Sequence, residues 1–374
     1  MPQRTIPDHI ALAPIGERID WVFDLARRHA EAFASPGAWL ARQRHLAQHP
    51  TAIMVLKCMD GRINIPVATQ TPPGIIQPFR NLGGIFDLGW PHLGETLVAH
   101  VDKVVAAGRA GLVMITYHFS KGDPARGCAG FHYRTEDARA HTLQIREQVR
   151  ALFGGADGGG GGGDVPTIFP LVCGFETDED ALVLHGEDGR TLSLADLSPA
   201  DADSLPQRLA ALLPGMPAAM RADLLPLLRG NLAHIAETRW QRAAGARALD
   251  IEHREWMLCV GRGFDWLHTP NLALIVGPYS PNLEGPILQA AGIVRANMEA
   301  GRIPDDGFLL LTSVPYEEIG VDRARAVLKC RFLARFAADA IGRHDPDLAA
   351  RMTLRRAVLN WETRAMEMLG DEAP

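Results

Sequence analysis

Two cysteines and one histidine, far apart in the sequence, carry side chains well suited to holding a transition metal. Cys58, His118 and Cys128 offer two thiolates and one imidazole, a donor set that suits Zn²⁺. Three protein ligands leave the fourth tetrahedral position open for water or substrate, as catalytic zinc requires. The three residues therefore predict a catalytic zinc centre. Because their spacing matches no compact zinc finger, buried thiols and an ordinary histidine are the alternative interpretation.

A carboxylate and a guanidinium follow the first cysteine closely. Two thiolates give a bound Zn²⁺ a formal charge of zero, so its water is less acidified than on a three-histidine site. Asp60 could accept that proton and orient the nucleophile, or could itself bind the metal and close the fourth position. Arg62 can hold Asp60 in a bidentate pair away from the metal. An exposed pair of little energetic consequence is the alternative.

Strands must bring these side chains to one place. The apolar run 52–56 predicts a buried strand that delivers Cys58 at its end, and the run 111–116 predicts a second strand that delivers His118. Open α/β sheets place their chemistry at the carboxyl ends of strands. We therefore expect Cys58 and His118 to lie together, with Cys128 reaching them from the following loop.

Periodicity and apolar runs predict the other elements of the first half. They are helices at 16–48, 95–107 and 135–153, strands at 167–172 and 181–184, and short helices over 197–230. The glycine-rich segment 154–164 has no surrounding P-loop pattern and predicts a surface loop.

The second half repeats this order of elements in weaker form. A strand at 256–260, a helix at 286–300 and a strand at 308–312 indicate an internal duplication. No cysteine follows the last strand at the matching distance, so only the first copy is expected to keep metal ligands. We predict an α/β protein with an N-terminal helical segment (1–50), a zinc-binding catalytic domain (51–195) and a degenerate duplicate (196–374).

Composition excludes several classes of protein. The 374 residues are 47% hydrophobic and 22% charged, as in folded proteins of two or three domains. A formal charge of −6 disfavours nucleic acid and anionic membrane partners. Apolar runs fall short of the ~20 residues that a membrane helix needs, and residues 1–20 lack the pattern of a secretory signal. Five cysteines, an odd and sparse set, favour a reduced compartment, and we expect a cytoplasmic protein.

With these residues in view, the sequence resembles the β-class carbonic anhydrases. The resemblance rests on C-M-D-G-R at residues 58–62, on F-R-N-L-G-G at residues 79–84, and on the His118 and Cys128 pair. Nine residues separate this histidine from this cysteine, where most members of the class have two. That longer loop, and the runs at 118–130 and 174–185, are similar to the carboxysome shell carbonic anhydrase branch.

The resemblance implies a fold, an activity and roles for residues. It implies a duplicated β-carbonic-anhydrase-like sheet flanked by helices, and zinc held by Cys58, His118 and Cys128 beside the dyad of Asp60 and Arg62. The implied reaction is the reversible hydration of CO₂ to bicarbonate by a metal-bound hydroxide, the lyase activity of a carbonic anhydrase. In that branch a histidine from the degenerate half reaches the working site. The E-H-R-E run at 252–255 matches it, so His253 is expected to donate to a substrate oxygen, with a surface histidine as the alternative.

The resemblance also implies that the protein forms a homodimer or a higher homo-oligomer. Residues 1–13 are shorter and less basic than the Rubisco-binding segment of carboxysomal members, so association with Rubisco or the carboxysome shell is not expected. One alternative is a zinc hydrolase acting on COS or CS₂, and another is a silent zinc-binding scaffold protein. Because the metal site is formally neutral, carbonic anhydrase activity is expected to rise with pH through the alkaline range.

Overall fold

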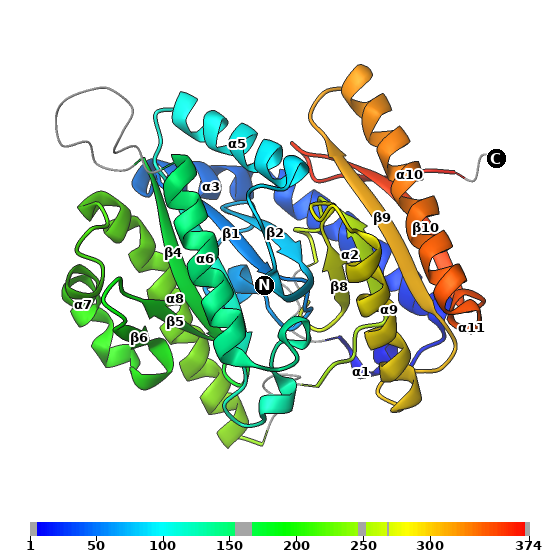
Figure 1. The fold of residues 1–374 in the computed structure, drawn as a ribbon, viewed down its shortest axis with the longest axis horizontal. Helices are drawn as coiled ribbons and strands as arrows, with labels where there is room; N and C mark the ends of the chain where they lie inside the picture. The colour runs from blue at the N-terminus through cyan, green and yellow to red at the C-terminus, as the bar shows by residue number, and fades with distance from the viewer. Residues whose placement is uncertain (1–5, 154–166, 246–251, 268, 371–374) are drawn as a thin grey trace. The chain divides into compact units, whose positions relative to one another are not determined.

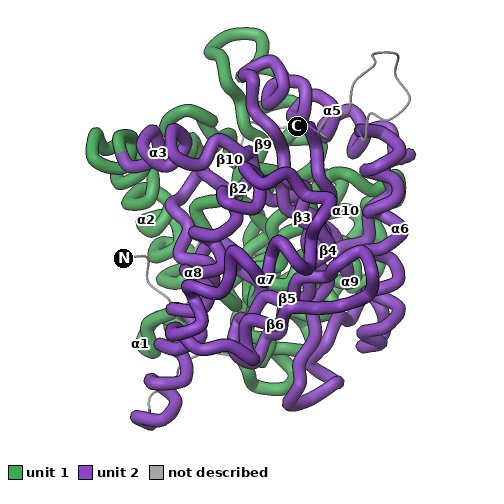
Figure 2. The backbone as a smooth tube through the Cα atoms, turned by 90° about the vertical axis from the view of Figure 1, so that its left-hand side faces the viewer, with its two compact units in different colours: residues 1–40, 59–62, 252–374 green, residues 41–58, 63–251 purple. Residues whose placement is uncertain are grey.

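The chain forms two compact units in a computed structural model that describes residues 6–153, 167–245, 252–267 and 269–370 (Figure 1). Unit 1 comprises residues 1–40, 59–62 and 252–374, and unit 2 comprises residues 41–58 and 63–251 (Figure 2). These units depart from the boundaries expected at 50 and 195, because the helical N-terminus groups with the second half and unit 2 continues to residue 251. The glycine-rich segment 154–164 lies outside the described residues.

A six-stranded sheet forms the centre of unit 2, in the order β2-β1-β3-β4-β5-β6. Its first four strands are parallel, and β5 and β6 are antiparallel. The strands are β1 (Ala52–Cys58), β2 (Ile76–Asn81), β3 (Gly111–Phe119), β4 (Ile168–Glu176), β5 (Ala181–His185) and β6 (Thr191–Ser193). All residues of β1 and β4 are buried, which explains their unbroken apolar runs. The predicted strands of the first half are confirmed, each beginning within a residue of its expected start.

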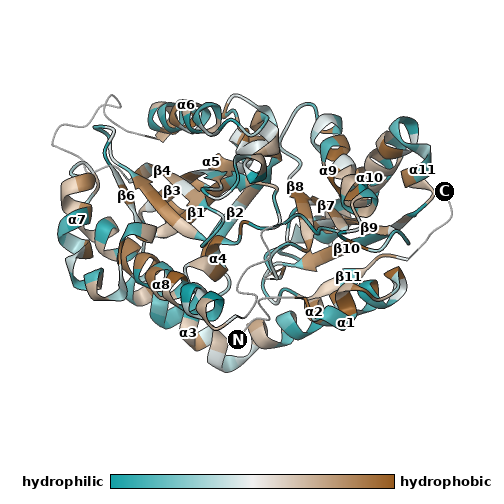
Figure 3. Ribbon diagram, turned by 90° about the horizontal axis from the view of Figure 1, so that it is seen from below, coloured by the Kyte–Doolittle hydropathy of each residue, from teal (hydrophilic) through white to brown (hydrophobic). Residues whose placement is uncertain are grey.

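Helices cover both faces of this sheet (Figure 3). They are α4 (Ile65–Ala68), α5 (Pro91–Ala106), α6 (Thr135–Phe153), α7 (Leu205–Leu212) and α8 (Ala218–Ala243). The prediction of short helices alone over 197–230 is wrong, because α8 runs for 26 residues through Pro226 and Gly230. A Cβ at Gly230 would clash with the carbonyl oxygen of Thr69, so glycine lets α8 approach the end of α4.

Unit 1 contains a five-stranded sheet in the order β8-β7-β9-β10-β11. Only β11 is antiparallel to its neighbour. The strands are β7 (Met257–Gly261), β8 (Ala273–Val276), β9 (Phe308–Tyr316), β10 (Met352–Asn360) and β11 (Met366–Met368). The helices are α1 (Asp8–Ala11), α2 (Ile15–Ala34), α9 (Glu284–Glu299), α10 (Val321–His344) and α11 (Pro346–Ala349). In Figure 3, α9 and α10 cover one face and α2 the other.

The N-terminal helical segment is confirmed, with a break where the prediction had one helix. Ser35 is extended, and α3 (Pro36–Gln48) begins after it, as proline favours. Within unit 1, α2 is fixed by buried Arg18, which pairs with Asp306 and lies over the ring of Trp256. Among the described residues, no helix combines the length and apolar character needed to cross a bilayer.

The two sheets share strand order and direction. Strands β2, β1, β3, β4 and β5 of unit 2 correspond in order to β8, β7, β9, β10 and β11 of unit 1, and in each set the last strand is antiparallel. The expectation of an α/β protein with helix-flanked sheets is therefore confirmed. Strand β10 and helix α10 were not among the predicted elements.

Candidate metal centre

The three predicted ligands meet in unit 2. One candidate ligand atom from each of Cys58, His118 and Cys128 lies within 4.8 Å of those of the other two. Their exposed fractions are 5%, 1% and 3%. Donor atoms around tetrahedral zinc are about 3.3–3.8 Å apart, given zinc–sulfur and zinc–nitrogen bonds of about 2.3 and 2.0 Å. The cluster has the donor chemistry and compactness for one zinc ion, and the expectation that these side chains converge is confirmed.

Strand geometry explains why Cys58 and His118 meet. Cys58 is the last residue of β1 and His118 the last but one of β3. The two strands are adjacent and parallel, with Leu56 opposite Ile115. Both side chains therefore lie at the carboxyl edge of the sheet, where ligands bind in open α/β folds.

The loop that carries Cys128 is held by its own hydrogen bonds. The carbonyl of Cys128 accepts from the backbone N–H groups of Phe131 and Tyr133 at 3.1 and 2.9 Å. Earlier in the loop, the carboxylate of Asp178 accepts from Ser120 Oγ at 2.8 Å and from the N–H of Gly122 at 2.7 Å. Although burial alone would raise it, these donors lower the pKa of Asp178. The nine residues between the histidine and the cysteine are thus anchored from the segment that follows β4.

A pair of glycines allows the F-R-N-L-G-G run at residues 79–84 to pack against these strands. Gly83 and Gly84 have φ of +66° and +67°, values that glycine adopts without strain. A Cβ at Gly84 would lie 3.1 Å from the carbonyl oxygen of Thr116 and 3.3 Å from the amide nitrogen of Cys58. The run therefore packs directly on the ends of both ligand-bearing strands.

Asp60 and Arg62 form the predicted bidentate pair within unit 1. Arg62 Nη2 donates to Asp60 Oδ2 at 2.6 Å, and its Nε and backbone N–H donate to Oδ1 at 3.1 and 2.8 Å. Both residues are buried, so the alternative of an exposed surface pair is wrong.

Backbone hydrogen bonds hold the turn that carries this pair beside β8 and the residues just before it. The N–H of Asn271 donates to the carbonyl of Gly61 at 2.7 Å, and that of Ile275 donates to the carbonyl of Met59 at 3.0 Å. A Cβ at Gly61 would lie 2.7 Å from the carbonyl oxygen of Ala273. Glycine therefore permits the close approach that positions the dyad.

His253 lies beside the dyad, in the same unit. Its Nε2 is 3.9 Å from Asp60 Oδ2, and its Nδ1 is 2.9 Å from Glu255 Oε2. Burial lowers the pKa of His253, but the carboxylates of Glu255 and Asp60 outweigh this effect and the net shift raises it. The histidine is ion-paired and mostly enclosed, which argues against the alternative of a plain surface histidine.

Glu255 is the residue that sequence reasoning missed. It is fully buried, and its Oε1 also accepts from the N–H of Gly61 at 3.3 Å. It thereby joins His253 to the turn that carries Asp60. The E-H-R-E run contains both residues, and a carboxylate two positions from a histidine was the available signal.

The chain was also compared with known proteins. No protein-family model matches it, and no curated protein matches it.

The other three cysteines, Cys173, Cys259 and Cys330, are fully buried in β4, β7 and α10, and none of them is part of the cluster of Cys58, His118 and Cys128.

Proposed function

We propose that this protein is a zinc-dependent carbonic anhydrase that interconverts CO₂ and bicarbonate. The convergence of Cys58, His118 and Cys128 in a buried cluster is the observation that carries the proposal. Two thiolates and one imidazole would hold zinc and leave one coordination position open. When bound, zinc would act as a Lewis acid that makes a nucleophile available from water near neutral pH.

Asp60 accepts the proton and orients the nucleophile in this proposal. It follows Cys58 by two residues, so their Cα atoms are at most about 7 Å apart. Arg62 engages both carboxylate oxygens and therefore competes with the metal for them. That competition favours an open coordination position over a closed, four-ligand site.

In the proposal, the ring N–H of His253 donates a hydrogen bond to a substrate oxygen. Burial lowers the pKa of His253, but the carboxylates of Glu255 and Asp60 raise it on balance, and the proposal places a proton on both ring nitrogens, with the Nδ1–H directed at Glu255. Its Nε2, near Asp60, then carries an N–H that can stabilise negative charge developing on bicarbonate.

The shared strand order supports a second part of the proposal, that the sheets arose by internal duplication of a β-carbonic-anhydrase-like unit. In unit 1, β7 ends in Gly261 and the last residue but one of β9 is Pro315, whereas in unit 2 β1 ends in Cys58 and the last residue but one of β3 is His118. The resemblance further supports a homo-oligomer, and the cysteine content supports a cytoplasmic location.

Zinc content and CO₂ hydration rate, measured on the same samples, test the proposal. Wild type should bind one zinc per chain and hydrate CO₂, and Cys128→Ala should lose most of both. Cys173→Ala is the matched control, because Cys173 is an equally buried cysteine in β4 outside the cluster, and it should retain both.

Three outcomes would contradict the proposed carbonic anhydrase activity. If the zinc-loaded wild type hydrolyses COS or CS₂ but does not hydrate CO₂, the enzyme has a different substrate. If the zinc-loaded wild type has no activity at any pH, the protein is a zinc-binding scaffold. Unchanged zinc in Cys128→Ala would exclude this ligand set.

A further inference from the structure

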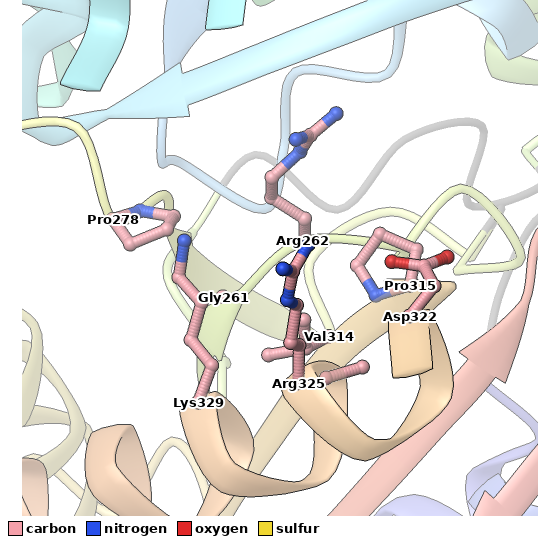
Figure 4. Close-up of a pocket in the computed structure, with 9 residues that line it drawn as sticks. Gly261, Arg262, Pro278, Val314, Pro315, Asp322, Arg325 and Lys329 are labelled. Atoms are coloured by element: carbon pink, nitrogen blue, oxygen red, sulfur yellow. The ribbon is translucent and has the colours of Figure 1, made fainter. Parts of the chain in front are cut away.

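The loop that brings Cys128 to the candidate metal centre is much longer than its counterpart in the other sheet. In unit 2, residues 120–134 join β3 to α6, whereas in unit 1 residues 317–320 join β9 to α10. Beside the short connection, a cavity lies between the ends of β7 and β9 and the first turns of α10 (Figure 4). Ordering a long loop costs conformational entropy. The loop in unit 2 therefore needs contacts that hold Cys128 in one position.

Those contacts come from the turn between β4 and β5. The backbone N–H and the Oγ1 of Thr177 both donate to the carbonyl of Phe119, the last residue of β3, at 2.9 and 3.2 Å. The carboxylate of Asp178 accepts from Ser120 Oγ and from the N–H of Gly122. The first residues of the loop are thus tied to this turn, and Asp178 is the side chain that reaches furthest along it.

Glu176, the last residue of β4, lies next to this anchor and is 1% exposed. Its Oε1 accepts from the N–H of Asp178 at 2.7 Å. A further hydrogen bond joins the two side chains. Two carboxyl groups can hydrogen-bond to each other only when one of them carries a proton. Because Asp178 already accepts from two other donors, Glu176 is the group that carries the proton.

The surroundings of Glu176 favour this protonated form. Burial above all raises the pKa of Glu176 to about 7, and the charge of Asp178 adds to this effect, while the N–H of Asp178 and the charge of Lys121 oppose it. On α8, Arg239 is also close enough for its pKa to be raised by Glu176, but its guanidinium donates to Glu179 at 2.9 and 2.6 Å. That cation is therefore engaged by a different carboxylate.

Other charged groups of the turn connect it to α8. Asp180 pairs with Nε2 of His234 at 2.9 Å, and Nη2 of Arg242 donates to the carbonyl of Asp178 at 2.6 Å. These contacts fix the side of the turn that faces the helix. A new negative charge at Glu176 would therefore act on the side that faces the loop, through the carboxylate of Asp178.

We propose that Glu176 and Asp178 are positioning residues that hold the Cys128 loop while Glu176 keeps its proton. When that proton passes to solvent water, neither carboxylate can donate, and two like charges face each other. Their repulsion draws Asp178 away from Ser120 and Gly122, so the loop loosens. The inference rests on the proposed zinc centre for the role of Cys128, but the loosening of the loop is measurable without the metal.

Amide hydrogen exchange of residues 120–127, measured by mass spectrometry on the full-length protein, tests the anchor. After correction for intrinsic exchange, wild type should be protected about tenfold more at about pH 6 than at about pH 8, the change in an equilibrium that accompanies one pKa unit. In Glu176→Gln a side-chain N–H replaces the carboxyl O–H as donor to Asp178, so protection should be high and equal at both pH values. Glu136→Gln removes an exposed carboxylate of α6, and this matched control should behave as wild type.

Release of zinc to a chelator, compared among variants at one pH, connects the anchor to Cys128. Asp178→Asn keeps only one side-chain oxygen to accept hydrogen bonds, so it should expose the loop at both pH values and release zinc faster than wild type. Glu176→Gln should release zinc more slowly than wild type at about pH 8, where the wild-type anchor is loosened. Circular dichroism of each variant establishes that it is folded.

Several results would overturn the inference. Wild-type protection could be equal at both pH values, or Glu176→Gln could be protected no better than wild type at the higher pH. Unchanged zinc release from Asp178→Asn, despite an exposed loop, would show that the anchor does not position Cys128. A wild type that binds no zinc would overturn the proposed function and with it the role of Cys128, whereas protection independent of pH would overturn the anchor alone.

Discussion

Asp60 carries a buried negative charge whose two oxygens both accept hydrogen bonds from Arg62. A buried carboxylate is costly unless it is paired, and this pairing also fixes its direction. The pair of Asp60 and Arg62 was predictable because only one residue separates them in the sequence. Glu255 was not, because its contact with the turn at Gly61 joins segments distant in the sequence. Local spacing identified the dyad, and only the fold revealed what supports it.

Removing the charge of Asp60 tests its part in proton transfer. Asp60→Asn keeps the shape of the side chain but cannot accept a proton, so the CO₂ hydration rate should fall by about 10²-fold, the usual contribution of general acid–base groups. Zinc content should stay at the wild-type level, because the proposed ligands are untouched. Loss of the metal in this variant would instead show that Asp60 is itself a metal ligand.

Replacing Glu255 tests the positioning of His253. In Glu255→Gln a charge that raises the pKa of His253 is removed, so this pKa should fall. Proton NMR titration of the His253 ring measures it. A pKa equal to that of wild type would show that Glu255 does not govern the histidine.

The same variant has a predictable effect on stability. A histidine whose folded pKa is raised stabilises the protein below its unfolded pKa, and this contribution is lost as pH rises through the folded pKa. Glu255→Gln should therefore lower the free energy of unfolding more at about pH 5 than at about pH 9, measured by urea denaturation. An equal loss at both pH values would contradict the ion pair.

Strands and helices were predictable from the sequence where nearly all residues of the element are buried. Strands β1 and β3 lie between layers of helices, so their apolar runs are nearly continuous. Strand β10 is only partly buried and includes Arg355 and Arg356, so it lacks that signal. Helix α8 was missed because Pro226 and Gly230 usually end helices, whereas here tertiary contact with α4 explains the glycine. The sequence signal therefore failed where packing between elements overrides local preference.

Alanine at two helical glycines tests this account of α8. In Gly230→Ala the new Cβ meets the carbonyl of Thr69, and overpacking should lower the free energy of unfolding by about 1–3 kcal/mol. Gly292, in α9, has open space around it and is exposed. Gly292→Ala should therefore raise that free energy by about 0.5–1 kcal/mol through helix propensity. Urea denaturation measures both, and stabilisation by Gly230→Ala would contradict the close approach.

At the scale of the whole molecule, unit 1 includes a short segment that directly follows the first candidate metal ligand in the sequence. The segment 59–62 belongs to unit 1, although the chain before and after it belongs to unit 2. Its hydrogen bonds run to Asn271, Ile275 and Glu255. Unit 1 thus holds the carboxylate of Asp60, which follows the candidate ligand Cys58 by two residues. Repeated element order allowed a duplication to be predicted, but not this exchange of a four-residue segment, which depends on long-range contacts.

The most direct test of the zinc centre is a crystal structure of the zinc-loaded protein, with diffraction measured on both sides of the zinc absorption edge. We predict one anomalous peak within about 2.0–2.4 Å of Cys58 Sγ, Cys128 Sγ and a ring nitrogen of His118, with no fourth protein atom bound. A peak elsewhere, or a carboxylate oxygen of Asp60 as the fourth ligand, would contradict the account.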